Sequence, residues 1–134
     1  MDQFDVIVIG TGTAGQTAAF DPAAEGYRVA VAENSPTPGG VCALQGCQAK
    51  KWFDETMEIV GRSRHLLGKG ITEPPGISWN QIQTQKSKFT SKIPETTITS
   101  LKDSDITYIP GQARFIDART LCAHRLYRRR LYFV

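Results

Sequence analysis

The amino-acid sequence predicts an α/β fold built on a parallel sheet, and three observations near its N-terminus support this. A nearly continuous apolar run, residues 4–9, has the composition of a strand that is covered on both faces. A glycine-rich turn and a helix, opened by Thr13, follow this run directly. A second apolar strand, residues 27–32, then ends at an acidic residue, Glu33. Alternation of strand, helix and strand is typical of parallel sheets.

The turn after the first strand reads GTGTAG, and its glycines have separate roles. Gly10 makes the tight turn, Gly12 lets the backbone approach a pyrophosphate, and Gly15 allows the helix to pack closely on the strand. The N-terminus of the helix directs N–H groups at the phosphates. The residues that open this helix are Thr13 and Ala14.

Glu33 stands at the end of the second strand. A carboxylate at this place accepts hydrogen bonds from a ribose 2′-OH and repels a 2′-phosphate. Together with the glycine turn, it predicts an adenine-dinucleotide site. The alternative is a glycine turn in some other α/β unit.

Two cysteines, Cys42 and Cys47, follow the glycine pair at residues 39–40. An ideal helix would hold their Cα atoms about 8.6 Å apart, whereas a disulfide tolerates no more than about 7 Å. A disulfide therefore needs a distorted helix start, which the glycine pair and Gly46 make easier. A helix N-terminus also favours a thiolate, the nucleophile of thiol exchange. We expect a redox pair in which Cys42, at the helix opening, is the more accessible sulfur and Cys47 the deeper one.

Other interpretations of this cysteine pair stay open on the residues alone. The pair could be half of a zinc site, but the remaining candidate ligands, Cys122, His65 and His124, are scattered without the usual spacing, so no metal site is expected. The pair could also be two unrelated buried thiols. We expect Cys122 to be a small buried hydrophobic residue and His65 a surface helix residue rather than a catalytic one.

With a dinucleotide motif and a dithiol so close in sequence, the chain resembles the class I pyridine nucleotide-disulfide oxidoreductases. This family includes glutathione reductase, dihydrolipoamide dehydrogenase and mercuric reductase. Its redox motif, GGxCxxxGCxPxK, matches residues 39–51 except that Ala49 replaces the family proline. The resemblance implies a Rossmann-like, three-layer FAD-binding domain with a parallel sheet, of which this chain is the N-terminal part. It implies FAD as cofactor, with NAD(P)H in the complete enzyme.

The resemblance also implies roles for individual residues. Cys42 would attack a substrate disulfide, Cys47 would lie beside the flavin, and Lys51 takes the position of the family lysine that lies against the flavin. These three are the expected catalytic residues. A later GxAxF segment is similar to the family strand near the adenine. The further FAD contacts implied in this way are Gly40, Val41, Gly111 and Ala113.

The remaining chain predicts further helices and strands. A helix over residues 52–70 carries an apolar stripe expected to lie in the core, made of Phe53, Met57, Val60 and Leu67. A capping box at Ser78 opens another helix, whose apolar stripe is Trp79, Ile82, Phe89 and Ile93. Prolines disturb helices, so we expect Pro94 to kink or stop this helix and Pro22 to kink or end the first one. Strands are expected at residues 106–109 and 113–116, joined by a turn.

Composition bears on partners and location. The net charge of the 134 residues is +3, but the excess arginine lies in the last segment, residues 124–134. We therefore expect no broad nucleic-acid surface, although this segment could bind polyanions weakly or be a solvated tail. No apolar run approaches the roughly 20 residues of a membrane span, so no membrane partner is expected. The 3 cysteines do not suggest a disulfide framework, and a cytoplasmic location is expected.

We expect residues 1–123 to form the N-terminal part of an FAD-binding domain with a redox-active cysteine pair, and residues 124–134 to be a basic tail outside the family pattern. The expected function is that of an FAD-dependent NAD(P)H:disulfide or metal-ion oxidoreductase, a homodimer when complete, acting on a small-molecule disulfide or a metal ion. The isolated segment is expected not to turn over. One alternative is a non-catalytic dinucleotide-binding remnant or interaction module. The other is a flavin-dependent NAD(P)H oxidoreductase that does not use the dithiol.

Overall fold

The computed structural model of the chain describes residues 2–124 and 128–133. The chain divides into two compact units. Unit 1 consists of Met1–Gly40 and Ile93–Val134, and unit 2 of Val41–Lys92. Within the described residues, no helix has both the length and the apolar character needed to cross a bilayer.

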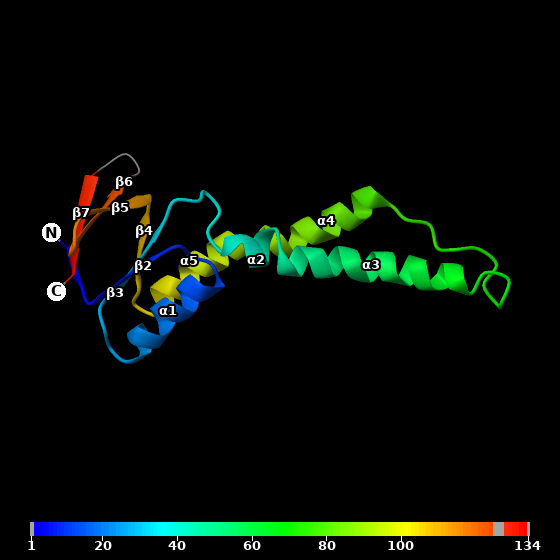
Figure 1. Ribbon diagram of the computed structural model, residues 1–134, viewed down its shortest axis with the longest axis horizontal. Coiled ribbons are helices and arrows are strands. Elements are labelled where there is room, and N and C mark those ends of the chain that lie inside the picture. The colour runs from blue at the N-terminus through cyan, green and yellow to red at the C-terminus, as the bar shows by residue number, and fades with distance from the viewer. Residues whose placement is uncertain (1, 125–127, 134) are drawn as a thin grey trace. The chain divides into compact units, whose positions relative to one another are not determined.

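A parallel sheet forms the centre of unit 1 (Figure 1). Its strands, in spatial order, are β2 (Val6–Ile9), β3 (Val29–Glu33) and β4 (Thr107–Pro110). The register pairs Val6 with Val29, and Ala30 with Thr107. Parallel neighbours need a crossover connection, and helix α1 (Thr13–Ala24) provides it between β2 and β3. The predicted α/β fold with a parallel sheet is confirmed.

A second sheet in unit 1 is mainly antiparallel. Its strands, in spatial order, are β1 (Asp2–Phe4), β7 (Arg128–Phe133), β6 (Thr120–His124) and β5 (Gln112–Asp117). Strand β1 runs parallel to β7, whereas β7 with β6 and β6 with β5 are antiparallel pairs. The strand predicted at residues 113–116 is therefore present within β5, but it belongs to a different sheet from β4.

The first apolar run forms two strands rather than the single strand predicted over residues 4–9. The run breaks at Asp5, whose N–H donates to the Arg28 carbonyl (2.9 Å) and whose Oδ2 accepts the Arg28 N–H (2.7 Å). These bonds hold Asp5 beside Arg28 and interrupt the strand there. The residues before Asp5 pair with β7 in the second sheet, and Val6–Ile9 pairs with β3 in the parallel sheet.

Unit 1 is built in layers, with the parallel sheet in the middle. The core between the two sheets contains Phe4, Ala30, Ile109, Leu121 and Ala123. The core between the parallel sheet and helices α1 and α5 (Ile93–Asp103) contains Val8, Ala19, Val29, Val31, Leu101 and Ile106. Strand β3 supplies residues to both cores because successive strand side chains point to opposite faces. The predicted three-layer architecture is confirmed.

Unit 2 is helical. Helix α2 (Gly40–Leu44) starts at the last residue of the first segment of unit 1, and α3 (Cys47–His65) and α4 (Trp79–Thr90) follow (Figure 1). Aromatic rings join α3 to α4: Phe53 stacks on Trp79, with 5.3 Å between ring centroids. The hydroxyl of Ser78 accepts the N–H of Gln81, so the predicted cap of α4 is confirmed.

The apolar stripes predicted for α3 and α4 are only partly buried. Val60 and Ile82 are buried, but Met57 is 42% exposed and Trp79 is 53% exposed. Helix α3 also ends at His65 rather than at the predicted residue 70, so Leu67 lies beyond it and is exposed. Assigning the whole stripe of α3 to a core was wrong, because two helices that pack on each other remove only one narrow face of each from water.

The two prolines lie at helix ends. Pro94 does not terminate α4, which ends earlier at Thr90; it lies in the first turn of α5, a helix that the sequence pattern did not predict and that Ile93 opens. Proline is tolerated there because the N–H it lacks would have no partner within the helix. Helix α1 continues through Pro22 and ends at Ala24.

Strand β7 lies within residues 124–134, the segment expected to be a basic tail. Its backbone pairs with β6 on one side and with β1 on the other. Residues 125–127 and 134 of this segment lie outside the described residues. At least Arg128–Phe133 therefore belongs to the second sheet rather than to a free tail.

Candidate functional site

The glycine turn connects β2 to α1 and leaves the helix start open. Gly10 has φ +100°, and its N–H donates to the Ala32 carbonyl of β3 (2.8 Å). The N-cap residue of α1 is Gly12, and no side chain caps the helix. A Cβ placed on Gly15 would lie 2.2 Å from the Gly10 carbonyl oxygen, so this close packing requires glycine. The first N–H groups of α1 are thus left without a capping side chain, as an anion-binding helix start requires.

The Glu33 carboxylate is held by hydrogen bonds from both sides. Its Oε2 accepts the Thr11 N–H (2.8 Å) and the Thr11 hydroxyl (2.6 Å), and its Oε1 accepts the Ser35 N–H (2.8 Å). Partial burial raises the pKa of Glu33, but the Thr11 hydroxyl and the backbone donors outweigh burial and hold the pKa below its ordinary value. The carboxylate is therefore ionised at neutral pH and fixed in orientation.

Thr11 is the residue of this site that sequence reasoning missed. Its side chain is fully buried, and its hydroxyl accepts the N–H of Gly39 (2.9 Å) while donating to Glu33. A signal for it exists in the sequence. Thr11 follows one parallel strand and Glu33 ends the next, and the carboxyl ends of neighbouring parallel strands meet at one edge of the sheet.

The glycine pair at residues 39–40 closes onto the turn. Gly39 and Gly40 have φ values of +127° and +79°, which favour glycine. A Cβ on Gly40 would lie 2.4 Å from the Gly12 Cα, and one on Gly39 would lie 2.6 Å from Cγ2 of Ile93. Both positions therefore exclude a side chain by contact as well as by backbone conformation.

Gly111 brings a third turn to the same edge of the sheet. Its N–H donates to the backbone carbonyl of Glu33 (2.7 Å), and it is buried with φ +150°. Ala113 follows on β5 and packs against the core between the sheets. The predicted cofactor residues that unit 1 contributes are Gly10, Gly12, Thr13, Ala14, Gly15, Glu33, Gly40, Gly111 and Ala113.

The remaining predicted site residues, Val41, Cys42, Cys47 and Lys51, belong to unit 2. Cys42 lies in α2 and Cys47 opens α3, both as free thiols. Between the two helices Gly46 adopts φ −101° and ψ −111°, so the helical path is interrupted between the cysteines, as their spacing predicts. Lys51 lies on α3 and is exposed.

The expected accessibility of the two sulfurs is wrong. Cys42 is half-buried, whereas Cys47 is exposed. The prediction placed Cys47 more than one turn deeper than Cys42, which lies at the helix opening. Because the helix breaks at Gly46, Cys47 instead begins a new helix.

The two thiols are electrostatically linked. The hydrogen bond with the Cys42 side chain, together with the charge of Cys42, raises the pKa of Cys47. The backbone of Cys47 and the charge of Lys51 act in the opposite direction, but less strongly. Cys47 therefore holds its proton more tightly than an ordinary thiol.

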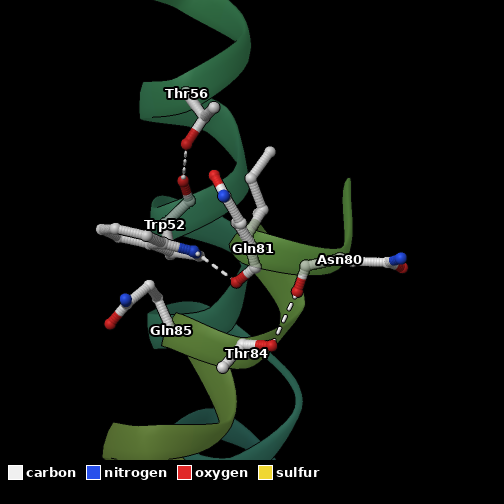
Figure 2. Close-up of a pocket in the computed structure, with 7 residues that line it drawn as sticks. Trp52, Thr56, Asn80, Gln81, Thr84 and Gln85 are labelled. Atoms are coloured by element: carbon white, nitrogen blue, oxygen red, sulfur yellow. Dashed lines mark hydrogen bonds between the residues drawn. The ribbon is translucent and has the colours of Figure 1, made fainter. Parts of the chain in front are cut away.

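Outside these motifs, unit 2 carries a groove between α3 and α4 (Figure 2). It has a volume of about 490 Å³ and is lined by Trp52, Thr56, Asn80, Gln81, Ile82, Thr84 and Gln85. The Trp52 indole N–H donates to the Ile82 carbonyl (3.1 Å), and the Thr84 hydroxyl donates to the Asn80 carbonyl (2.8 Å). These bonds use the indole N–H and the hydroxyl within unit 2.

Two further residues lie as the sequence predicts. His65 is exposed on α3, and Cys122 is buried on β6.

Comparison with known proteins agrees with this geometry. The family model described as pyridine nucleotide-disulphide oxidoreductase matches residues 4–126. This chain belongs to that family. The resemblance inferred from the glycine turn and the cysteine motif is confirmed.

Individual relatives point the same way. The chain is 30% identical over 119 residues to a dihydrolipoyl dehydrogenase of Haemophilus influenzae, covering 88% of this chain and 25% of the relative. It is 30% identical over 122 residues to a mercuric reductase of Lysinibacillus sphaericus, covering 90% of this chain and 22% of the relative. The chain thus spans about a quarter of the length of these relatives.

A solved structure is similar over nearly the whole chain. It is the Cu(II) complex of the HOCl-induced flavoprotein disulfide reductase RclA from Escherichia coli, with a TM-score of 0.76 and 26% identity. The match covers 99% of this chain and 27% of that one. FAD, with NAD(P)H-using members, is the cofactor set of the family, in agreement with the prediction.

Proposed function

We propose that this chain is the FAD- and dithiol-bearing segment of a flavin-dependent NAD(P)H:disulfide or metal-ion oxidoreductase. The observation that carries the proposal is the ionised Glu33 carboxylate, held beside an uncapped helix start in a chain of this family. The two features provide an acceptor for ribose hydroxyls and donors for a pyrophosphate, and FAD contains both groups. The residues present therefore fit FAD.

Each binding residue has a distinct task in this proposal. The N–H groups of Thr13 and Ala14 donate to the pyrophosphate, and Gly12 leaves room for its approach. Glu33 accepts from the ribose. By family resemblance, Gly111 and Ala113 lie on the adenine side. The residues assigned to the flavin side in the same way are Gly40, Val41 and Lys51.

The cysteine pair would reduce a disulfide in two exchange steps. The Cys42 thiolate attacks one substrate sulfur, which forms a mixed disulfide and releases the other sulfur as a thiolate that takes up a proton. Cys47 then loses its proton and attacks Cys42, which releases the second thiol and closes the Cys42–Cys47 disulfide. FAD, when bound, supplies the two electrons from NAD(P)H that reopen this disulfide. The raised pKa of Cys47 supports this order, because it keeps the proton on Cys47 during the first step.

The finer features of the proposal rest on family resemblance. They are a small-molecule disulfide or a metal ion as substrate, a homodimer as the complete enzyme, and a cytoplasmic location. The segment by itself is proposed not to turn over. Neither nucleic acid nor a membrane is proposed as a partner.

Titration with FAD, followed by quenching of flavin fluorescence, tests the proposal. We expect saturable binding of one FAD per chain and weaker binding of NADP, since its 2′-phosphate would meet the Glu33 carboxylate. Glu33→Gln should weaken FAD binding by about 1–3 kcal/mol, the cost of losing hydrogen bonds to a charged group. Glu25→Gln, an exposed acid at the end of α1, is the matched control and should leave affinity unchanged. NADP binding as tight as FAD binding would contradict the assignment.

A further inference from the structure

Thr11 lies where the glycine turn meets the end of β3 and the glycine pair. Its N–H and hydroxyl both donate to Oε2 of Glu33, and its hydroxyl accepts from Gly39. Gln16 adds a fourth bond, from its side-chain amide to the Thr11 carbonyl (2.8 Å). Thr11 is therefore bonded to α1, to the end of β3 and to the glycine pair.

The hydroxyl of Thr11 is not needed to make the turn. The positive φ of the turn lies at Gly10, and the turn's own backbone bonds, from Gly10 N–H to Ala32 and from Gln16 N–H to Gly12, do not use the Thr11 hydroxyl. A buried hydroxyl costs free energy unless its hydrogen bonds are made, and here the donor and an acceptor position are both used. Without the hydroxyl, the buried N–H of Gly39 would lose its partner and Glu33 would lose its shortest bond.

The bonds to Glu33 also decide what this carboxylate can still accept. An ionised carboxylate offers about four lone-pair positions. Thr11 occupies Oε2 with two donors, and Ser35 takes one position on Oε1. The backbone N–H of Asn34 also helps to hold the carboxylate. An incoming hydroxyl group would therefore approach on the Oε1 side, which Thr11 does not bond.

We propose that Thr11 is a positioning residue for nucleotide binding: its hydroxyl orients the Glu33 carboxylate toward a ribose hydroxyl and ties it, through Gly39, to the glycine pair packed on Gly12. The part of this inference that concerns ribose rests on the proposed function. The hydrogen-bond relay itself does not depend on it.

The test compares Thr11→Ser, which keeps the hydroxyl, with Thr11→Ala, which removes it. Both variants lose the methyl group, so their difference isolates the hydroxyl. In the FAD-free chain, NMR should show faster amide hydrogen exchange at Gly39 and a higher pKa for the Glu33 carboxyl in Thr11→Ala than in Thr11→Ser. Equal exchange and equal titration in the two variants would overturn the relay.

Binding experiments then test the role in nucleotide recognition. Thr11→Ala should bind FAD about tenfold more weakly than Thr11→Ser, the size expected for one hydrogen bond to a charged group. Its affinity should also fall at a higher pH on acidification, because the less well held carboxylate protonates earlier. Adding Glu33→Gln should remove the difference between the variants, since Thr11 acts through Glu33. A difference that persists without the carboxylate would overturn the positioning role.

These outcomes separate this inference from the proposed function. If the unaltered chain binds no FAD, the proposed function fails, while the NMR comparison still decides the relay. If the chain binds FAD and both variants bind equally, the proposed function stands and the role of Thr11 is wrong.

Discussion

Unit 1 has apolar cores on both faces of its parallel sheet, although Phe115 and Ile116 of β5 are exposed, whereas the helices of unit 2 share one interface and bury few apolar residues. Leu101 and Leu121 of unit 1 are almost fully buried, but Ile59 of α3 is 59% exposed and Trp79 of α4 is 53% exposed. The polar residues differ too. Glu33 in unit 1 is fixed by several donors, while Lys51 and Cys47 in unit 2 are exposed.

This difference between the units matches the two tasks in the proposed reaction, nucleotide binding and thiol exchange. Nucleotide binding needs donors and acceptors that stay in place, and a layered core provides rigid strand ends for them. Thiol exchange needs sulfur atoms that can meet each other and a substrate in turn. The break at Gly46 separates α2 from α3, so the two cysteines lie on different helices.

The largest expected effect comes from the core of unit 1. Leu101→Ala should lower the free energy of unfolding by about 2–5 kcal/mol, because Leu101 is fully buried between helix and sheet. Ile59→Ala, at an exposed site on α3, should change it by less than about 0.5 kcal/mol. Urea denaturation followed by circular dichroism measures both.

Tryptophan fluorescence sharpens this experiment, because both tryptophans of the chain, Trp52 and Trp79, lie in unit 2. If the units unfold separately, Leu101→Ala should shift the circular dichroism transition and leave the fluorescence transition in place. Coincident shifts of both signals would mean that the chain unfolds as one cooperative body, and the contrast between the units would then not extend to stability.

Replacing one glycine by alanine in each unit should change the free energy of unfolding in opposite directions. Gly15→Ala places a Cβ against the Gly10 carbonyl, so we expect a loss of about 1–3 kcal/mol in unfolding free energy and weaker FAD binding. Gly61→Ala, in α3 with open space around it, should instead stabilise the helix by about 0.5–1 kcal/mol. Thermal unfolding measures both changes, and destabilisation at Gly61 would refute this account of unit 2.

The smallest expected effect is a shift in the pH dependence of Cys47 alkylation. Because Cys42 raises the pKa of Cys47, Cys42→Ala should lower it, and Cys47 should then react with iodoacetamide at a lower pH. Mass spectrometry of the alkylated peptide follows the rate against pH. Cys122, which is buried, serves as the internal control for unfolding. An unchanged pH profile of Cys47 would show that the thiols do not share a proton.

Local chemistry made several features of the chain predictable from sequence. The turn around Gly12, the strand ending at Glu33 and the cap at Ser78 each depend on a few neighbouring residues whose backbone needs are known. The unpredicted features depend on pairs far apart in the chain. Asp5 bonds to Arg28, and Thr11 bonds to Glu33, and no local period records either pairing.

Several predictions about the helices were wrong for a related reason. Periodicity shows which face of a helix is apolar, but not how much of it a neighbour covers, so Met57 was wrongly assigned to a core. Pro94 was expected to kink or stop the preceding helix, although proline is equally suited to the first turn of a new helix. The exposure of Cys47 followed from a break whose position the spacing alone did not specify.

Unit 1 is discontinuous in sequence, and this has a consequence for the order of events during synthesis. Strand β3 is complete by Glu33, but its parallel neighbour β4 begins only at Thr107. Until then the far edge of β3 has unpaired backbone groups, the kind of edge that invites association with other chains. The helices of Val41–Lys92 form locally and faster than a parallel pairing can. Gly39 packs on Ile93, so the two segments of unit 1 can meet once Ile93 has been synthesised. The edge of β3 then stays unpaired only until β4 leaves the ribosome.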